Sequence, residues 1–147
     1  MTSGQLDPAD PPAGRVLLVD DNAVNRLITR GLLRRLGIAP DEAGDGRQAL
    51  SAMRATAYAL VLMDCQMPVV DGYEATRRLR SGVDRGATAG DVPVVAITAH
   101  DGAGSRERCL DAGMDGYLAK PIRPDELFAV TRTLADQPAS QAILIES

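Results

Sequence analysis

The chain has 147 residues, a formal net charge of −4, and a composition that is 45% hydrophobic and 24% charged, which suits one soluble domain with its own core. No apolar run approaches the roughly 18 residues of a membrane-spanning helix, so we expect neither a transmembrane helix nor a secretory signal. The acidic balance and the absence of Trp argue against direct nucleic-acid binding. Cys65 and Cys109 fit no metal or redox spacing, which favours reduced thiols in a cytoplasm.

Composition divides the chain into three segments. Residues 1–14 are rich in proline, glycine and small polar residues, and we interpret them as a flexible leader or linker. Residues 15–136 carry the regular patterns of one domain, and residues 137–147 form a tail. The tail has an apolar patch at 142–145, for which three alternatives stay open: it extends the last helix, packs on a neighbour, or frays.

The first predicted strand starts at Arg15, where "RVLLVDD" is a short apolar run bounded by acids. A helix follows over 22–37, with Gly37 at the position that commonly ends helices. The spacing of its apolar residues predicts that one face is buried, formed by Val24, Leu27, Ile28, Leu32 and Leu36.

The remaining pattern repeats this alternation of strand and helix. The predicted strands lie at 38–43, 59–64, 92–98 and 116–120, and the predicted helices at 45–55, 72–80, 104–112 and 123–136. Strands that are apolar throughout are buried on both faces, which predicts an α/β fold with a parallel sheet covered by helices. Pro40 places the second strand at a sheet edge, which fits a doubly wound five-stranded sheet of order 2-1-3-4-5.

Polar side chains follow four of the predicted strands. Ligands bind beyond the carboxyl ends of the strands in such sheets, and the residues there are Asp20, Asp21, Asp64, Thr98 and Lys120. Clustered carboxylates repel one another unless a cation neutralises them, and oxygen ligands select Mg²⁺. A metal, a lysine and a hydroxyl are the parts that phosphoryl transfer needs. No GxxxxGK[ST] motif occurs, so ATP is not expected as the direct donor.

Four stretches give the chain a resemblance to a known family. "LLVDDN", "LVLMDCQMPVVDGYEATRRLR", "VPVVAITAH" and "GYLAKPI" resemble the receiver domain of two-component response regulators over residues 15–136, with a closer similarity to receivers of hybrid histidine kinases. The resemblance implies the flavodoxin-like receiver fold. It also implies roles for seven residues: Asp64 as phosphoacceptor, Asp20 and Asp21 as the acidic pocket, the backbone carbonyl of Gln66 as a further Mg²⁺ ligand, Lys120 beside the phosphoryl group, and Thr98 with Tyr117 as a switch pair.

The function implied is a phosphorelay receiver. Asp64 would take a phosphoryl group from a phosphohistidine on a kinase or phosphotransfer protein, without separate substrate turnover. The change would reshape the face formed by 104–112, 116–120 and 123–136, and a homodimer is possible on phosphorylation. The resemblance also suggests a cis peptide at Lys120-Pro121.

Several alternatives stand beside this interpretation. The chain is either free-standing or part of a hybrid kinase that relays phosphate to a histidine phosphotransfer protein. A functional alternative of a different class is an interaction module that is never phosphorylated. A small-substrate phosphohydrolase would need a second acid where Gln66 stands. Asp20 and Asp21 alone would also suit a helix N-terminus. His100 is expected to line the site, and the resemblance implies that Gln66 and His100 tune how quickly the acyl phosphate hydrolyses.

Overall fold

The computed structural model describes residues 15–82, 86–99 and 103–135, without the side chains of 103, 104 and 133–135. The predicted leader, the tail at 137–147 and His100 lie outside the described residues. Within the described part of the chain, no helix is both long enough and apolar enough to cross a membrane.

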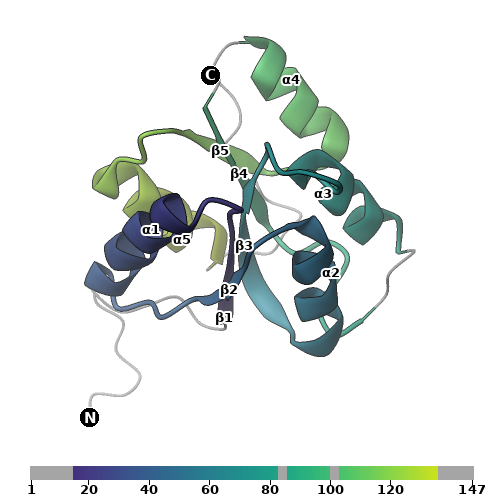
Figure 1. Cartoon of the computed structure of the whole chain (residues 1–147), viewed down its shortest axis with the longest axis horizontal. Coiled ribbons are helices and arrows are strands. Elements are labelled where there is room, and N and C mark those ends of the chain that lie inside the picture. Colours follow the sequence, from purple (N-terminus) through teal and green to yellow (C-terminus); the bar gives the residue numbers. More distant parts are fainter. Residues whose placement is uncertain (1–14, 83–85, 100–102, 136–147) are drawn as a thin grey trace.

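The described strands form a single parallel sheet (Figure 1). Its order is β2-β1-β3-β4-β5, which confirms the predicted doubly wound topology. β2 lies at the edge and has only three residues, and Pro40 stands just before it, as a proline at a sheet edge should. The strands are β1 (Arg15–Val19), β2 (Asp41–Ala43), β3 (Tyr58–Asp64), β4 (Val94–Thr98) and β5 (Gly116–Ala119).

Helices cover both faces of this sheet. In Figure 1, α1 and α5 lie together on one side, whereas α2, α3 and α4 lie on the other. Each observed element overlaps its predicted range, and the largest difference is β2, which starts three residues later than expected. The helices are α1 (Ala23–Arg35), α2 (Gly46–Ala55), α3 (Gly72–Ser81), α4 (Ala103–Ala112) and α5 (Pro124–Ala135).

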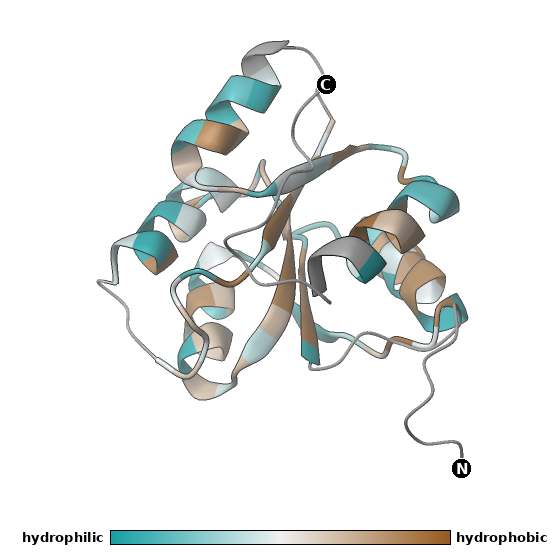
Figure 2. Cartoon of the chain, turned by 180° about the vertical axis from the view of Figure 1, so that it is seen from behind, coloured by the Kyte–Doolittle hydropathy of each residue, from teal (hydrophilic) through white to brown (hydrophobic). Residues whose placement is uncertain are grey.

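Two hydrophobic cores follow from the alternation of side chains along the strands. Leu18 of β1 packs with Leu33 of α1 and Leu127 of α5, whereas its neighbour Leu17 joins the core beneath α2, α3 and α4. All of these side chains are fully buried. In Figure 2 the central strands are accordingly brown along most of their length, whereas the helices mix teal and brown residues.

The predicted buried face of α1 is wrong in its first half. Leu32 and Leu36 do pack against the core, but Val24, Leu27 and Ile28 are 64%, 56% and 57% exposed. The residues of α1 that the sheet buries are Thr29 and Leu33. The helix starts only four residues after β1 ends, so its first turns stand at the carboxyl edge of the sheet, where less of the sheet lies beneath them.

Candidate functional site

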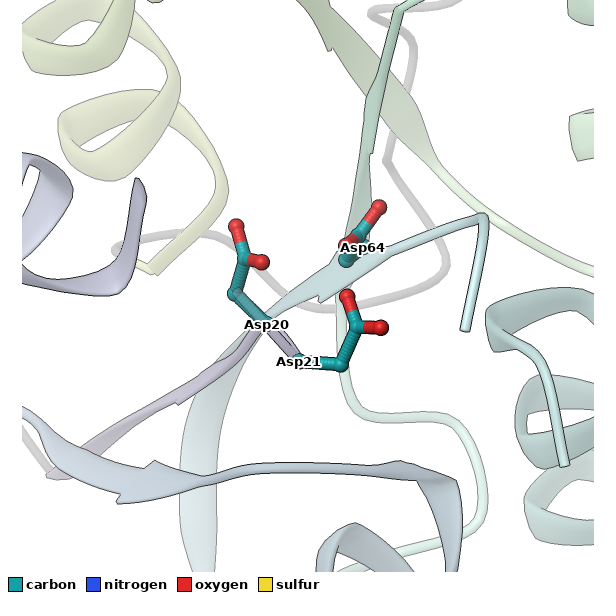
Figure 3. A group of neighbouring side chains, drawn as sticks. All are labelled: Asp20, Asp21 and Asp64. Carbon is teal, nitrogen blue, oxygen red and sulfur yellow. The ribbon is translucent and has the colours of Figure 1, made fainter. Parts of the chain in front are cut away.

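Three carboxylates gather at the carboxyl edge of the sheet, as the sequence predicts. Asp20 and Asp21 follow β1, and Asp64 ends β3. Each offers a ligand oxygen, and these oxygens all lie within 4.8 Å of one another. Figure 3 shows the three side chains pointing into the same space beyond the strand ends. Asp20 and Asp64 are each 1% exposed, whereas Asp21 is exposed to solvent.

The sheet itself brings the acids together. β1 and β3 are parallel neighbours in which Val19 pairs with Met63, so the residue after each of these arrives at the same level of the sheet. The backbone N–H of Asp20 donates to the carbonyl of Ala43 on β2 at 3.1 Å, which extends the ladder by one step. The position of Asp20 is therefore set by strands on both sides.

Asn22, and not the adjacent acids, caps helix α1. Its Oδ1 accepts hydrogen bonds from the backbone N–H groups of Val24 at 2.9 Å and Asn25 at 3.0 Å. The alternative in which Asp20 and Asp21 cap the helix is therefore wrong. The predicted helix already started at Asn22, and Asn is among the preferred N-cap residues. Because Asn22 fills this role, the carboxylates of Asp20 and Asp21 are left for the cluster.

Electrostatics in the cluster favour a bound cation. Burial, with the nearby charge of Asp20, raises the pKa of Asp64 from 3.8 to about 7, and Lys120 only partly opposes this effect. Oδ1 of Asp20 accepts from the backbone N–H of Asn22, but its buried Oδ2 has no hydrogen-bond partner among the described residues. An unpaired buried carboxylate oxygen is costly, and a hard cation would satisfy it. The donor set therefore fits Mg²⁺.

Lys120, the residue after β5, faces the two buried acids. Its Nζ lies 3.6 Å from Oδ1 of Asp64 and 3.9 Å from Oδ2 of Asp20, which is ion-pair distance but too long for a good hydrogen bond. The backbone N–H of Lys120 donates to the carbonyl of Thr98 at 2.8 Å, and the Lys120-Pro121 peptide is cis. The amine is thus held within reach of any group placed on Asp64.

Thr98 and Tyr117 lie on the neighbouring strands. Thr98 ends β4 and is fully buried, and the register pairs Asp64 with Ile97, one residue before it. Tyr117 pairs with Ala96 and is partly buried against the core under α2, α3 and α4. The structure therefore places the predicted switch residues on one side of the acid cluster, on the two strands that lead away from it.

The β3–α3 loop turns sharply beside Asp64. The backbone N–H of Gln66 donates to Oδ1 of Asp64 at 3.1 Å, while the Gln66 side chain is exposed. The N–H of Val70 donates to the carbonyl of Pro68 at 2.8 Å, and Val69 between them has a positive φ of 68°. This is a γ-turn in its strained form, centred on a β-branched residue. The turn reverses the chain a few residues after Asp64.

Sequence spacing gave no reason to connect the two cysteines, but the fold brings them together. Cys65 follows β3, Cys109 lies in α4, and both are buried free thiols that hydrogen-bond to each other. Their contact joins the residue after Asp64 to a helix that is distant in sequence. Both cysteines are free thiols, as predicted, but their spacing along the chain gave no sign of this contact.

A doubly wound sheet with an acid cluster and a lysine at its carboxyl edge defines a phosphoacceptor class of signalling domain. The family model described as the response regulator receiver domain matches residues 16–132. The protein therefore belongs to the response regulator receiver family and is a receiver domain of two-component signalling.

Known proteins resemble this chain closely. Sensor protein GacS from Pseudomonas syringae pv. syringae is 40% identical over 123 residues, which cover 84% of this chain and 14% of that protein. The receiver domain of sensor histidine kinase PA1611 from Pseudomonas aeruginosa, solved with magnesium coordinated in its active-site cleft, is 40% identical with a TM-score of 0.74. The match covers 83% of this chain and 97% of that one.

A second similar solved structure is a complex. It contains the Saccharomyces cerevisiae phosphotransfer protein Ypd1 and the receiver domain of its downstream response regulator Ssk1. The identity is 30% and the TM-score 0.72, over 91% of this chain and 94% of that chain. The protein thus spans nearly the whole of these solved receiver domains but only about a seventh of GacS.

Proposed function

We propose that this receiver domain accepts a phosphoryl group from a phosphohistidine onto Asp64 and that Mg²⁺ assists the transfer. Asp20, Asp21, Asp64 and the backbone carbonyl of Gln66 would hold the ion. The observation that carries the proposal is the environment of Asp64, a buried carboxylate between a second acid and a lysine amine. The receiver relatives with magnesium in the cleft support the choice of metal.

In the proposed reaction an oxygen of Asp64 attacks phosphorus as the P–N bond of the phosphohistidine breaks. The bonding pair returns to the imidazole, and the product is an acyl phosphate on Asp64. Bound Mg²⁺ would neutralise charge on the transferring oxygens. Lys120, whose Nζ is 3.6 Å from Oδ1 of Asp64, supplies the second positive charge near these oxygens. The domain therefore assists its own modification and has no separate substrate to turn over.

The signal would leave through β4 and β5. New phosphoryl oxygens on Asp64 attract the hydroxyl of Thr98, which stands at the end of the next strand. Movement of Thr98 gives the ring of Tyr117 space to turn inward and shifts the balance between two packings of the α4, β5 and α5 face. Dimerisation through this face on phosphorylation is part of the proposal.

The donor would dock over the first turns of α1. The exposed side chains of Val24, Leu27 and Ile28 form an apolar patch there. Beside it lies a pocket of about 320 Å³, lined in part by Asp20, Ile28 and Lys120 and so continuous with the acid cluster. A histidine-bearing phosphotransfer protein or kinase domain fits this place, because its phosphohistidine must reach Asp64. The Ypd1–Ssk1 receiver complex supports such a partner.

The position of this receiver in a relay is a second proposal. Relatives include GacS and hybrid signal transduction histidine kinase I of Dictyostelium discoideum, which is 37% identical over 81% of this chain. Receivers of hybrid kinases pass phosphate onward, so we infer transfer from Asp64 to a histidine phosphotransfer protein. All of these partners imply a cytoplasmic location for the domain.

The test is phosphorylation of the whole chain, read by intact mass. Acetyl phosphate, and separately a phosphorylated histidine phosphotransfer protein, should add one phosphoryl group in Mg²⁺ and none in excess chelator. Asp64→Asn should abolish the mass gain, whereas Asp111→Asn, which removes an exposed acid on α4, should leave it unchanged. An unchanged mass of the unsubstituted chain with both donors would contradict the proposal.

A further inference from the structure

Arg26, in the first turns of α1, hydrogen-bonds to the backbone of the acidic turn, by which we mean residues Asp20 to Asn22. Its Nη1 donates to the carbonyl oxygen of Asp20 at 2.6 Å, and its Nε donates to Oε1 of Glu42 at 3.1 Å. The side chain is 25% exposed. We infer that Arg26 is a positioning residue for the metal site, acting through the peptide between Asp20 and Asp21. The inference deepens the proposed function and rests on it.

The geometry of the peptide bond explains how this contact acts on Asp21. The carbonyl of Asp20 and the N–H of Asp21 belong to one planar unit, so a hydrogen bond to that oxygen fixes the plane's rotation. The plane's orientation sets the direction in which the side chain of Asp21 leaves the backbone. Because Asp21 is exposed, neighbouring side chains do not bury it, and its aim toward the cluster depends on the backbone. Mg²⁺ demands near-ideal octahedral geometry, so a loosened ligand weakens binding.

Two other backbone groups of this turn are held by hydrogen bonds of their own. The N–H of Asp20 bonds to Ala43 of β2, and the N–H of Asn22 bonds to Oδ1 of Asp20 at 2.9 Å. The Asp20 carbonyl stands past the end of the β1 strand, and the described partner that holds it is the guanidinium of Arg26. Without that donor the carbonyl would turn to water, and the Asp20–Asp21 peptide would gain freedom to rotate.

Glu42 holds Arg26 in place and also pairs with Arg30, and Arg30 is the matched control. Oε2 of Glu42 accepts from Nη1 of Arg30 at 2.8 Å, one helical turn beyond Arg26. Arg30 therefore pairs with the same carboxylate on the same helix, but the hydrogen bond to the Asp20 carbonyl comes from Arg26. Replacing Arg30 removes one charge and one ion pair, as replacing Arg26 does, without releasing the acidic turn.

A positioning role and a purely electrostatic role for Arg26 predict opposite effects of its removal on Mg²⁺ binding. A positive charge near the cluster repels a divalent cation, so its removal would tighten Mg²⁺ binding if charge alone mattered. A positioning role means that removal weakens binding. Arg26→Lys separates the two further, because lysine keeps the charge but lacks the forked donors that reach both acceptors.

The experiment titrates the whole 147-residue chain with Mg²⁺ by calorimetry. Arg26→Gln should raise the dissociation constant roughly tenfold, in the range seen when groups that orient metal ligands are removed. The dissociation constant of Arg26→Lys should lie between those of Arg26→Gln and the unsubstituted protein. That of Arg30→Gln should stay within about twofold of the value for the unsubstituted protein. In chelator, the amide protons of Asp20 to Asn22 should exchange with deuterium faster in Arg26→Gln than in Arg30→Gln.

Rates of phosphorylation by acetyl phosphate give a second readout. In Arg26→Gln the Mg²⁺ concentration at half-maximal rate should rise about as much as the dissociation constant, with the maximal rate near that of the unsubstituted protein. A lower maximal rate at saturating Mg²⁺ would instead indicate general damage, and equal Mg²⁺ affinities of Arg26→Gln and Arg30→Gln would overturn the inference. If the unsubstituted chain binds no Mg²⁺, the proposed metal site itself is wrong and the inference is overturned with it.

Discussion

Asp64 is a buried carboxylate that must be ionised to act as a nucleophile. Burial and the charge of Asp20 raise its pKa to about 7, so without a cation Asp64 holds a proton at a higher pH than an ordinary aspartate does. A divalent cation lowers that pKa and restores the carboxylate. If Asp64 is the phosphoacceptor that we propose, this environment would make its reactivity depend on a bound cation.

This environment also sets a pH dependence of stability. The pKa of Asp64 is higher in the folded chain than in the unfolded one, so the stability that its proton confers is present at low pH and is lost as pH rises through 7. Asp64→Asn keeps a neutral side chain at every pH. In chelator, we compare the free energy of unfolding of Asp64→Asn with that of the unsubstituted protein. This difference should be more favourable to the variant at pH 8 than at pH 5, by about 2 kcal/mol.

Urea denaturation at the two pH values measures this difference. Asp111→Asn again serves as the control, because an exposed acid on α4 should show no such change with pH. A difference that is equal at both pH values would mean that the Asp64 carboxylate is not destabilised by its surroundings.

At the scale of single elements, the start of α3 is pressed against the end of β3. A Cβ atom on Gly72 would lie 2.3 Å from the carbonyl oxygen of Asp64, a backbone atom that cannot move aside by rotating a side chain. Gly72 also donates its N–H to the carbonyl of Cys65 at 3.2 Å. The close approach of α3 to β3 therefore requires glycine at this position, and it fixes where the strand ends.

Gly72→Ala should push α3 away from Asp64, lowering the free energy of unfolding by about 2 kcal/mol, as overpacking does, and slowing phosphorylation. Gly31→Ala is the matched control, because a Cβ there meets nothing within 4 Å and alanine favours the helix by about 0.5 to 1 kcal/mol. Thermal unfolding and the intact-mass assay give both quantities. Normal phosphorylation of Gly72→Ala would show that the acceptor tolerates a shifted α3.

The elements also show what a sequence can and cannot predict. The buried strands and their order followed from apolar runs and from Pro40, and strand ends placed Asp20, Asp64 and Lys120 together. The periodicity of α1 could not reveal that its first turns stand at the edge of the sheet, so the burial predicted for Val24 was wrong. The hydrogen bond from Arg26 to the carbonyl of Asp20 depends on the path of the folded chain, which the spacing of residues in the sequence does not show.

At the scale of the whole molecule, the site joins parts that are far apart in the chain. Asp21 follows β1, Asp64 ends β3 and Lys120 follows β5, so a ligand bound between them needs the sheet to be assembled. Such a ligand binds the folded state and not the unfolded chain. Metal binding and folding are therefore linked.

Mg²⁺ at a hundredfold excess over its dissociation constant should raise the free energy of unfolding by about 2.7 kcal/mol. Asp21→Asn should remove most of that gain while changing the metal-free stability little, because Asp21 is exposed. Denaturation with and without Mg²⁺ checks both expectations. An equal gain in the Asp21→Asn variant would place the ion elsewhere.

The two edges of the sheet are short. β2 offers three residues and β5 four, and Glu42 on β2 is tied to arginines of α1. Short edges give a foreign strand few backbone groups to pair with, which disfavours both edge-to-edge aggregation and the addition of a peptide strand. We therefore expect this domain to bind other proteins through its helices and loops, the parts of the surface that can change shape when the groups at the strand ends are modified.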